Sequence, residues 1–374
     1  MPLACPDILS HIGPNSRRTT ARTSPMLRAS TGNVNNAVSN MEDTPLAKVV
    51  AALFRFPPFW ERARQNARSM ITKRAEQIGV DWDELTRETA AKGVNWDDVR
   101  AKVEDVEVTR VLPQYYTKPF HAYPKGNLSW EAALEVEAAA QSVHATVFSS
   151  DGKELDPSGD ARLRSSYSDC LLRLLDSLDI RRPCDVIDLG CATGLSSMEL
   201  LRVLDGDDVN VTGVDLSPFF LAVGEYLRQN RAAMSSSSTT ATMLVPSAYE
   251  RVKYLHRPAE DTKLPEGAYD LVSSCLTFHE LPQQASKDII KEAYRLLRPG
   301  GAFAIMDMNP SSEAFQRIQN NLFAYTAFKS TEPWLAEYAS LDVHAALREA
   351  GFEVSQQLEN SPRHRTIVAK KKDE

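Results

Sequence analysis

Residues 188–194 read Asp188-Leu189-Gly190-Cys191-Ala192-Thr193-Gly194 and join two runs of different character. The apolar run before them, residues 185–189, predicts a buried strand, and residues 195–204 have the apolar spacing of a helix. A glycine-rich turn between a strand and a helix lets the backbone approach a bound nucleotide and directs helix N–H groups towards it. The stretch therefore predicts a nucleotide-binding α/β domain.

The acids at the ends of the first two predicted strands indicate the charge of the ligand. Asp188 would repel a pyrophosphate over the turn, whereas it would attract a cofactor that carries a sulfonium and an ammonium group. Asp215 ends the second strand, at the position where such folds bind ribose hydroxyls with an acid. Its alternative role is the N-cap of the next helix, and both roles can coexist. The pattern favours a cationic nucleoside cofactor.

A third acidic position follows the strand predicted at residues 253–256. Ala259, Glu260 and Asp261 stand where the adenine amino group of such a cofactor would be met. We expect a contact through the backbone together with Glu260 or Asp261, and an exposed acidic turn is the alternative.

Strands and helices alternate from about residue 161 to the C-terminus. Predicted strands cover residues 185–189, 209–215, 253–256, 269–275, 302–308, 352–358 and 366–370. Predicted helices cover residues 161–178, 195–204, 218–231, 283–297, 313–328 and 341–350. This rhythm implies an α/β fold with a Rossmann-like, mostly parallel sheet covered on both faces, whose last two strands pair as an antiparallel hairpin.

The chain divides into three parts, residues 1–41, 44–150 and 160–374. The first part carries four arginines and a single acid. This bias predicts a cleaved transit peptide for a chloroplast, with a mitochondrion as the alternative, although a disordered tail has a similar composition. Residues 44–75 form a helical pattern that is broken at Pro57-Pro58 and has a basic second half. We expect their apolar side chains to pack on the main domain. The alternative is that the segment contacts an anionic membrane surface.

An aromatic loop precedes the predicted α/β domain. It contains Tyr115, Tyr116 and His121, and a helix over residues 130–147 follows, with Asn127 or Ser129 as its cap. We expect this helical extension to cover the active site and the three side chains to contact the substrate. The alternative is that the aromatic side chains only pack.

Composition and charge exclude several classes of protein. The net charge of −7 repels nucleic acid, so no nucleic-acid partner is expected. No apolar run approaches the roughly 18 residues that a membrane-spanning helix needs. The five cysteines form no Cys-x-x-Cys pair and no zinc spacing, and no metal site is expected.

Several motifs in the right order resemble the class I methyltransferases of type 11, which are related to the ubiquinone and menaquinone C-methyltransferases. They lie at residues 186–194, 214–218 and 295–301, within a resemblance that covers residues 185–370. It implies S-adenosylmethionine as the cofactor. Residues 115–130, 278–282, 330–334 and 362–366 resemble more closely a plant and algal plastid branch of these enzymes, which supports a chloroplast address.

The resemblance implies a cofactor site around the first turn. Its expected residues are Asp188, Gly190, Cys191, Ala192, Thr193, Gly194, Asp215, Leu216, Ala259, Glu260 and Cys275. Two positions depart from the family. Arg257-Pro258-Ala259 stands where the family often has Gly-Asp-Ala, so the contact of that aspartate with adenine does not carry over. Ala192 replaces a glycine, which the turn tolerates if the φ angle of this residue is negative.

The chemistry of such an enzyme needs few residues. Methyl transfer from a sulfonium is an in-line displacement, which alignment and water exclusion largely accomplish. If oxygen or an activated carbon is methylated, a base is wanted, and His279, just past the fourth predicted strand, is the best placed. A core or surface histidine is the alternative.

We therefore expect a methyltransferase that acts on a small, apolar or aromatic metabolite. A peptide acceptor stays open. One alternative is an S-adenosylmethionine-binding assembly protein without transfer activity. A nicotinamide or flavin oxidoreductase is a second alternative, which Asp188 disfavours.

Overall fold

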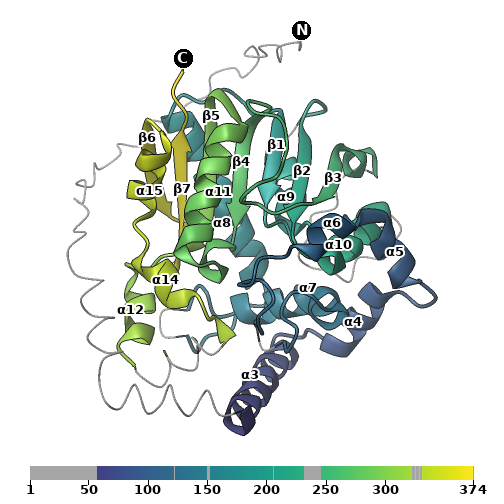
Figure 1. Cartoon of the computed structure of the whole chain (residues 1–374). Helices are drawn as coiled ribbons and strands as arrows, with labels where there is room; N and C mark the ends of the chain where they lie inside the picture. Colours follow the sequence, from purple (N-terminus) through teal and green to yellow (C-terminus); the bar gives the residue numbers. More distant parts are fainter. Residues whose placement is uncertain are drawn as a thin grey trace, which may run out of the picture.

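The structure is a computed structural model that describes residues 57–121, 123–149, 152–204, 206–230, 246–321, 325, 328 and 331–373. The predicted transit peptide and the apolar first half of the 44–75 segment lie outside these residues. Figure 1 shows one sheet in the upper part of the molecule and a group of helices below it.

Seven strands form this sheet in the order β3-β2-β1-β4-β5-β7-β6. The strands are β1 Asp185–Leu189, β2 Asn210–Asp215, β3 Val252–His256, β4 Tyr269–Cys275, β5 Leu297–Met308, β6 Val354–Glu359 and β7 His364–Lys370. Strands β1 to β5 are parallel, and β7 lies antiparallel between β5 and β6. The predicted Rossmann-like sheet with its terminal hairpin is confirmed. Its carboxyl ends share one edge, and the chain order reverses between β1 and β4, where ligands of open α/β sheets bind.

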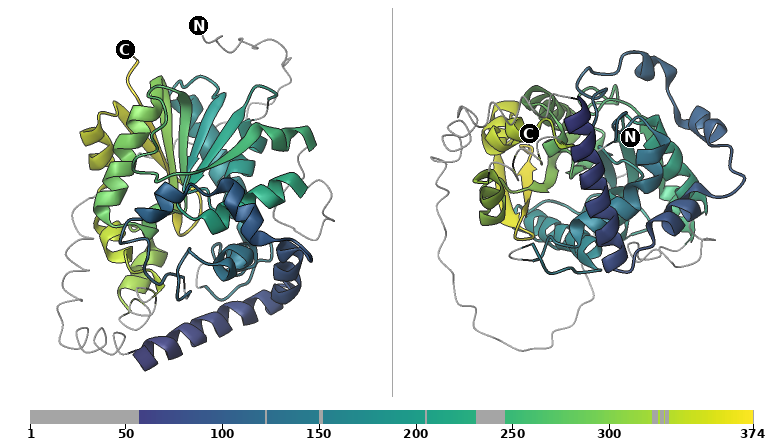
Figure 2. Two further views of the ribbon diagram at one scale, coloured as in Figure 1. Left: turned by 45° about the vertical axis from the view of Figure 1, so that its right-hand side comes forward. Right: turned by 90° about the horizontal axis from the view of Figure 1, so that it is seen from below.

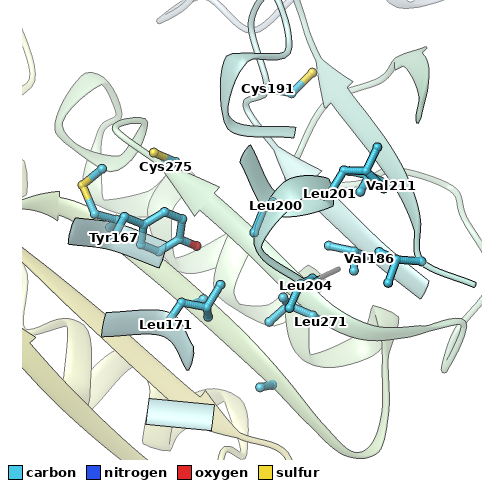
Figure 3. Packing of buried hydrophobic residues seen from close by; sticks show 14 of the residues in the cluster. Tyr167, Leu171, Val186, Cys191, Leu200, Leu201, Leu204, Val211, Leu271 and Cys275 are labelled. Carbon is cyan, nitrogen blue, oxygen red and sulfur yellow. The ribbon is translucent and has the colours of Figure 1, made fainter. Parts of the chain in front are cut away.

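Helices cover both faces of the sheet. On one face lie α8 (Gly159–Ser177), α9 (Leu195–Leu204) and α10 (Pro218–Asn230), which bury the apolar cluster of Figure 3. On the other face α11 (Gln283–Leu296) and α15 (Val343–Ala350) bury a second cluster. Both clusters use alternate side chains of the central strands, because successive side chains of a strand point to opposite faces. The sheet is thus a rigid platform for the loops at its carboxyl edge.

Some elements differ from the prediction for local reasons. Strand β5 begins at Leu297, earlier than predicted, and its pairing with β4 is irregular beside the Pro299-Gly300-Gly301 turn. Helix α12 spans Glu313–Gln319 and is shorter than predicted, and α14 (Leu335–Ser340) was not predicted. Helix α15 starts after Asp342, whose side chain accepts the N–H of Ala345 as a cap.

The N-terminal part contributes short helices below the sheet. They are α3 Pro57–Gln77, α4 Trp82–Ala90, α5 Trp96–Val103, α6 Val106–Arg110 and α7 Trp130–His144. Seen from below, α3 lies in front and crosses the molecule (Figure 2). The side chain of Ser129, one of the two expected caps, accepts the N–H of Ala132 at the start of α7. These helices gather at the carboxyl edge of the sheet, where a cover is expected (Figure 1).

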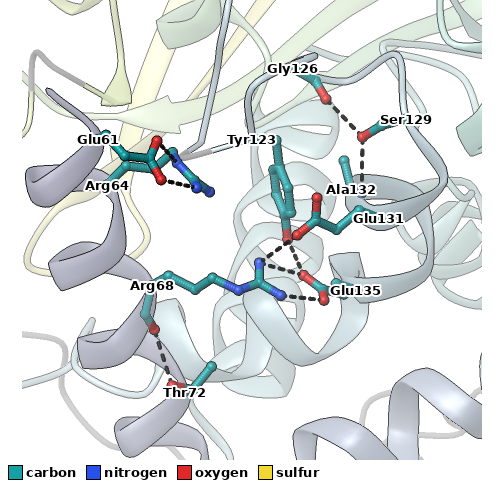
Figure 4. Close-up of polar contacts among 10 residues, drawn as sticks. All are labelled: Glu61, Arg64, Arg68, Thr72, Tyr123, Gly126, Ser129, Glu131, Ala132 and Glu135. Carbon is teal, nitrogen blue, oxygen red and sulfur yellow. Dashed lines mark hydrogen bonds and ion pairs between the residues drawn. The ribbon is translucent and has the colours of Figure 1, made fainter. Parts of the chain in front are cut away.

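An ion pair between Arg68 and Glu135 connects helix α3 to α7. The guanidinium of Arg68 donates to both oxygens of Glu135 at 2.9 and 2.6 Å, and the Tyr123 hydroxyl donates to the same carboxylate at 2.8 Å (Figure 4). Arg64 pairs with Glu61 within α3. Two basic residues of this segment are therefore held by the protein itself, as the packing alternative expects. None of the described helices has the length and apolar character needed to cross a membrane, and membrane-surface contact stays a prediction.

Asp160, at the start of α8, is bonded to His144 of α7 and forms a buried ion pair with Arg164 of its own helix, and its loss is expected to destabilise the fold. Asp160, 1% exposed, lies 2.6 Å from Nδ1 of His144 and accepts from Nε of Arg164 at 3.0 Å. Replacing Asp160 by asparagine leaves Arg164 without its countercharge, so the free energy of unfolding should fall by about 3 to 5 kcal/mol. Urea unfolding followed by circular dichroism measures this change.

The matched control is Asp169→Asn, an exposed position of the same helix, for which a change within about 0.5 kcal/mol is expected. Burial alone would raise the pKa of Asp160, but Arg164 and His144 hold it well below its ordinary range. The stabilisation is therefore present at neutral pH and is lost as the pH falls below the ordinary range of an aspartate. Equal effects of the two substitutions would contradict this account.

Candidate functional site

The glycine-rich turn follows β1 and leads into α9. Gly190, Ala192 and Gly194 have φ angles of +79°, +48° and +87°. The condition under which the turn would tolerate Ala192 without strain, a negative φ, is therefore not met, and this alanine occupies a region that costs an L-residue about 1 to 2 kcal/mol. The N–H of Ala192 donates to Oδ2 of Asp215 at 2.9 Å, which holds the turn in this conformation. Backbone strain maintained by a neighbouring acid is typical of a ligand site.

Asp188 lies under the turn with one oxygen satisfied and one free. Its Oδ2 accepts the hydroxyls of Ser196 and Ser197, both at 2.7 Å, whereas Oδ1 is buried and has no hydrogen-bond partner among the described residues. Burial raises the pKa of this carboxyl to about 6. A buried carboxylate oxygen without a partner is costly unless a ligand pairs with it. This fits a ligand that brings a donor or a positive charge.

The next two acids at this edge, Asp215 and Glu260, each accept a hydrogen bond from a tyrosine hydroxyl. Asp215 accepts the N–H of Ser217 at 2.7 Å and the hydroxyl of Tyr116 at 3.3 Å, both on Oδ1. The hydroxyl of Tyr115 donates to Oε1 of Glu260, whose Oε2 is buried without a partner in the described part of the chain. Asp215 therefore holds the residue that precedes α10, but the N-cap of α10 is Ser217, whose hydroxyl accepts the N–H of Phe220 at 3.2 Å. The N-cap role considered for Asp215 is wrong, and its contact with the ribose stays a prediction. Of the acids after β3, Glu260 points inwards, whereas Asp261 is exposed and pairs with Lys263.

The structure therefore places two of the expected substrate residues beside the acids expected to bind the cofactor. The rings of Tyr115 and Tyr116 meet edge to face, with centroids 6.4 Å apart. Tyr115, Leu255 and Ala259 are partly buried and pack against the apolar cluster on the α11 face of the sheet. The two tyrosines thus lie on the acids expected to meet the ribose and the adenine, and their contact with the substrate stays a prediction.

The remaining predicted cofactor residues line the same edge with little exposed side chain. Cys191 and Cys275 are buried in the apolar cluster between α8, α9 and the sheet, so only the backbone of Cys191 is suited to meet a ligand (Figure 3). Thr193 and Leu216 are 5% and 7% exposed. Their positions fit a tight backbone cradle, and the individual contacts stay predictions.

A second group, which we call the histidine–carboxylate cluster, consists of His121, His279, Glu280, Asp307 and Glu332. His279 and Glu280 lie in the 3₁₀ turn η2 (Phe278–Glu280) directly after β4. Nδ1 of His279 is 2.8 Å from Oδ1 of Asp307, near the end of β5. Nε2 of His121 is 3.0 Å from Oε1 of Glu332 and 3.7 Å from Oε1 of Glu280. Four separate segments thus bring these side chains together.

Charge is crowded in this cluster. Burial would lower the pKa of His279, but Asp307 and the two glutamates outweigh it and raise the pKa to about 10. Burial raises the pKa of Glu280 to about 7, against the effect of both histidines. In the ligand-free site His279 therefore holds a proton near neutral pH. The expectation that His279 acts as a base stays a prediction. It requires that a bound group lower the pKa of His279, so that the ring gives up this proton before it accepts another.

Asn127 connects the cluster with the cofactor acids. Its side-chain amide donates to Oε2 of Glu280 at 3.2 Å, and its backbone carbonyl accepts the hydroxyl of Ser217 at 2.6 Å. Ser217 follows Asp215 by two positions and donates its N–H to it. The loop before α7 therefore bridges the two halves of the site, as expected of an active-site cover.

Two residues of this cluster were missed in the sequence. Asp307 is an acid within the apolar run of the predicted strand at residues 302–308, which is a usable signal, because an acid in a buried strand needs a partner. Glu332 lies in the stretch 330–334 that resembles the plastid branch, but that resemblance assigns it no role, and the sequence pattern there gives no sign of burial. His121 and His279 are far apart in the chain, so no spacing motif shows that they meet.

Residues 187–305 match the family model described as a methyltransferase domain. With the sheet order, the strained turn and the acids at its edge, this match identifies the domain. The chain carries a class I S-adenosylmethionine-dependent methyltransferase domain. S-adenosylmethionine is its cofactor, and the partnerless oxygen of Asp188 and the glycine turn fit this cationic nucleoside.

Curated relatives agree with this assignment at low identity. An uncharacterized methyltransferase of Synechocystis is 28% identical over 48% of this chain and 72% of its own length. The 27-O-demethylrifamycin SV methyltransferase of Amycolatopsis mediterranei is 26% identical over 48% of this chain and 58% of its own length. A demethylmenaquinone methyltransferase of Listeria monocytogenes is 24% identical over 39% of this chain and 54% of its own length. The chain thus spans little more than half the length of the last two relatives.

Proposed function

We propose that this chain transfers the methyl group of S-adenosylmethionine to a small, apolar or aromatic metabolite by in-line displacement. The carrying observation is the arrangement of the two half-sites, a cofactor cradle around Asp188 and Asp215 and a histidine–carboxylate cluster bridged to it by Asn127. A methyl acceptor between them would be held beside the cofactor and shielded by the aromatic loop. Alignment and exclusion of water supply most of the rate enhancement in such a transfer.

The acceptor class has support from the character of the cover. Tyr115 and Tyr116 are half-buried. Their aromatic rings offer an apolar surface and their hydroxyls a few polar groups, a combination that is typical of sites for small molecules. Two of the relatives are named for small-molecule acceptors, 27-O-demethylrifamycin SV and demethylmenaquinone. In this proposal His279, with its ring held by Asp307, faces the reacting atom of the acceptor.

The proposal is tested with labelled cofactor. Extract from a strain that lacks the gene is incubated with the purified full chain and S-adenosylmethionine labelled in the methyl group, and the labelled product is identified. We expect label in one small molecule, and none when the Gly190→Arg variant, which cannot seat the cofactor, replaces the parent. Tight binding of S-adenosylmethionine without any labelled product would support the assembly-protein alternative instead. Tight NAD(H) binding with no response to S-adenosylmethionine in calorimetry would favour the oxidoreductase.

The cell compartment is proposed on separate grounds. The arginine-rich composition of residues 1–41 and the resemblance to a plastid branch support import into a chloroplast. A fluorescent protein fused behind residues 1–41 should accumulate in chloroplasts of a green alga or plant. Accumulation in mitochondria would favour the alternative address.

Asp188 predicts how the affinity for S-adenosylmethionine depends on pH. With its pKa raised to about 6 in the ligand-free protein, the carboxyl is ionised at pH 8 and largely protonated at pH 5. Since the cationic cofactor favours the ionised form, its dissociation constant should be about tenfold higher at pH 5 than at pH 8. Isothermal titration calorimetry at several pH values measures this. The Asp188→Asn variant should bind weakly at every pH, and an equally steep pH dependence in this variant would show that another group is responsible.

A further inference from the structure

We propose that His121, His279 and Glu280 bind one divalent transition-metal ion, with Glu332 as a further carboxylate ligand, and that this ion holds the oxygen or sulfur atom that is methylated. The inference rests on the proposed function, because it specifies which acceptors the site takes. It assigns the histidine–carboxylate cluster a role that neither the family match nor the sequence motifs give.

The donor atoms are close enough for one ion. One nitrogen from each histidine and one oxygen of Glu280 all lie within 4.8 Å of one another. The carboxylate of Glu332 is 3.0 Å from Nε2 of His121. A metal ion at about 2.0 to 2.2 Å from each atom would need only small rotations of these side chains.

The hydrogen bonds of His279 and Glu280 each leave one atom of the side chain available to bind a metal ion. Nδ1 of His279 is occupied by Asp307, so Nε2 is the atom that this ring presents to the site. A carboxylate on the second ring nitrogen fixes the tautomer and the orientation of metal-binding histidines and strengthens them as ligands. The Asp307 oxygens also accept the backbone N–H groups of His279 and Met308, which immobilises the pair. Asn127 orients Glu280 in a similar way.

Glu332 supplies an independent sign of a missing ligand. This residue is 5% exposed, and its Oε2 is buried without a hydrogen-bond partner among the residues that the structure describes. A buried carboxylate oxygen that is left without a partner costs free energy. Its neighbour Oε1 already faces His121, so a cation in the cluster would satisfy the carboxylate. The backbone bond from the N–H of His121 to the carbonyl of Thr331 holds the two segments together.

The donor set selects the metal and the acceptor. Two imidazoles with one or two carboxylates suit zinc or a similar transition metal rather than magnesium or calcium, which prefer oxygen ligands. His121 is 39% exposed on its side chain, so one side of the cluster is accessible to an acceptor. A hydroxyl or thiol bound to the ion loses its proton to water. A lone pair of the oxygen or sulfur then forms the bond to the methyl carbon while the electron pair of the breaking C–S bond returns to the sulfonium sulfur, which leaves S-adenosylhomocysteine.

Zinc binding to the chelator-treated full chain tests the site. We expect calorimetry to show zinc bound with an affinity that His121→Ala lowers by more than about 100-fold, and Asp307→Asn, as a positioning change, by about 10- to 100-fold. The matched control is His344→Ala, a histidine on α15 that bonds to Ser355 and Gln357 away from the cluster, and its affinity should equal that of the parent. Zinc that binds equally well to His121→Ala would be held elsewhere and would overturn the inference.

Two further readouts follow, one spectroscopic, which does not depend on activity, and one that measures the methylation rate. Cobalt(II) in place of zinc should give visible absorption bands in the parent and in His344→Ala, and a loss of these bands in Glu332→Gln with an unchanged circular dichroism spectrum supports the site. Absent bands in the parent overturn it. If the chelator-treated chain still methylates its acceptor at the full rate, the metal inference fails while the proposed function stands. If S-adenosylmethionine does not bind at all, the proposed function fails first.

Discussion

Replacing Gly190 by alanine is expected to lower the affinity for S-adenosylmethionine by more than about 100-fold while the domain stays folded. Gly190 has a φ of +79°, and an added Cβ would lie 2.6 Å from both Cγ2 and Oγ1 of Thr277. The turn or Thr277 must move, and the turn is the segment expected to lie against the cofactor. Since the strain falls on the binding surface itself, affinity suffers more than stability. Calorimetry with S-adenosylmethionine and thermal unfolding measure the two effects.

The matched control is Gly267→Ala. Gly267 has a similar φ of +62°, but an added Cβ would meet no atom within 4 Å. Both substitutions carry the backbone strain of an alanine at positive φ, about 1 to 2 kcal/mol, so both should lower the melting temperature, and Gly190→Ala should lower it further because of the clash with Thr277. Only Gly190→Ala should weaken the cofactor. Removing the clash in the double variant with Thr277→Ala should restore part of the affinity, and an unchanged affinity in the single variant would contradict the assignment of the turn.

Replacing Asp215 by asparagine is expected to weaken S-adenosylmethionine by about 10- to 100-fold. The carboxylate accepts three hydrogen bonds, from the N–H groups of Ala192 and Ser217 and from Tyr116. The side-chain amide of asparagine has only one accepting oxygen, so one of the two backbone N–H groups would face its NH₂ group. The substitution also removes the negative charge that ribose hydroxyls would bind. A hydrogen bond to a charged group contributes about 1.5 to 3 kcal/mol, which sets the expected range. The dissociation constant from calorimetry is the measurement.

Asp342→Asn is the control for this substitution. Asp342 also accepts a backbone N–H at the start of a helix, that of Ala345 at 2.9 Å, but it lies at α15, away from the cofactor turn. Because asparagine is as good a helix cap as aspartate, neither stability nor affinity should change. If Asp215→Asn bound the cofactor as tightly as the parent, Asp215 would serve only to hold the glycine-rich turn and the residue before α10.

The fold could be predicted largely because its signals are local. The strands at 185–189 and 269–275 and the helix at 195–204 agree with the structure at both ends, since each is a buried apolar run limited by turn residues. The acids at 188 and 215 could be placed for the same reason, because the carboxyl ends of parallel strands share one edge. Strand β5 was predicted too short, because glycine and proline in the turn before residue 302 concealed its irregular first residues.

The histidine–carboxylate cluster could not be predicted in the same way. His279 was singled out from its place after a strand, but its partners His121, Asp307 and Glu332 come from three other segments. Their meeting depends on how the N-terminal cover and the segment before α14 fold over the sheet, which is set by tertiary packing and not by spacing. For the same reason no metal site was expected from the sequence.

The tyrosine pair over the cofactor cradle has a consequence for the binding of the cofactor. The hydroxyls of Tyr116 and Tyr115 are bonded to Asp215 and Glu260, the acids that the ribose and adenine would also use. The tyrosine hydroxyls and a bound cofactor would therefore compete for the same carboxylates. The apparent affinity for the cofactor would then equal the intrinsic affinity multiplied by the fraction of molecules in which the tyrosines are withdrawn. Cofactor binding would therefore go together with withdrawal of the two tyrosine hydroxyls from these acids.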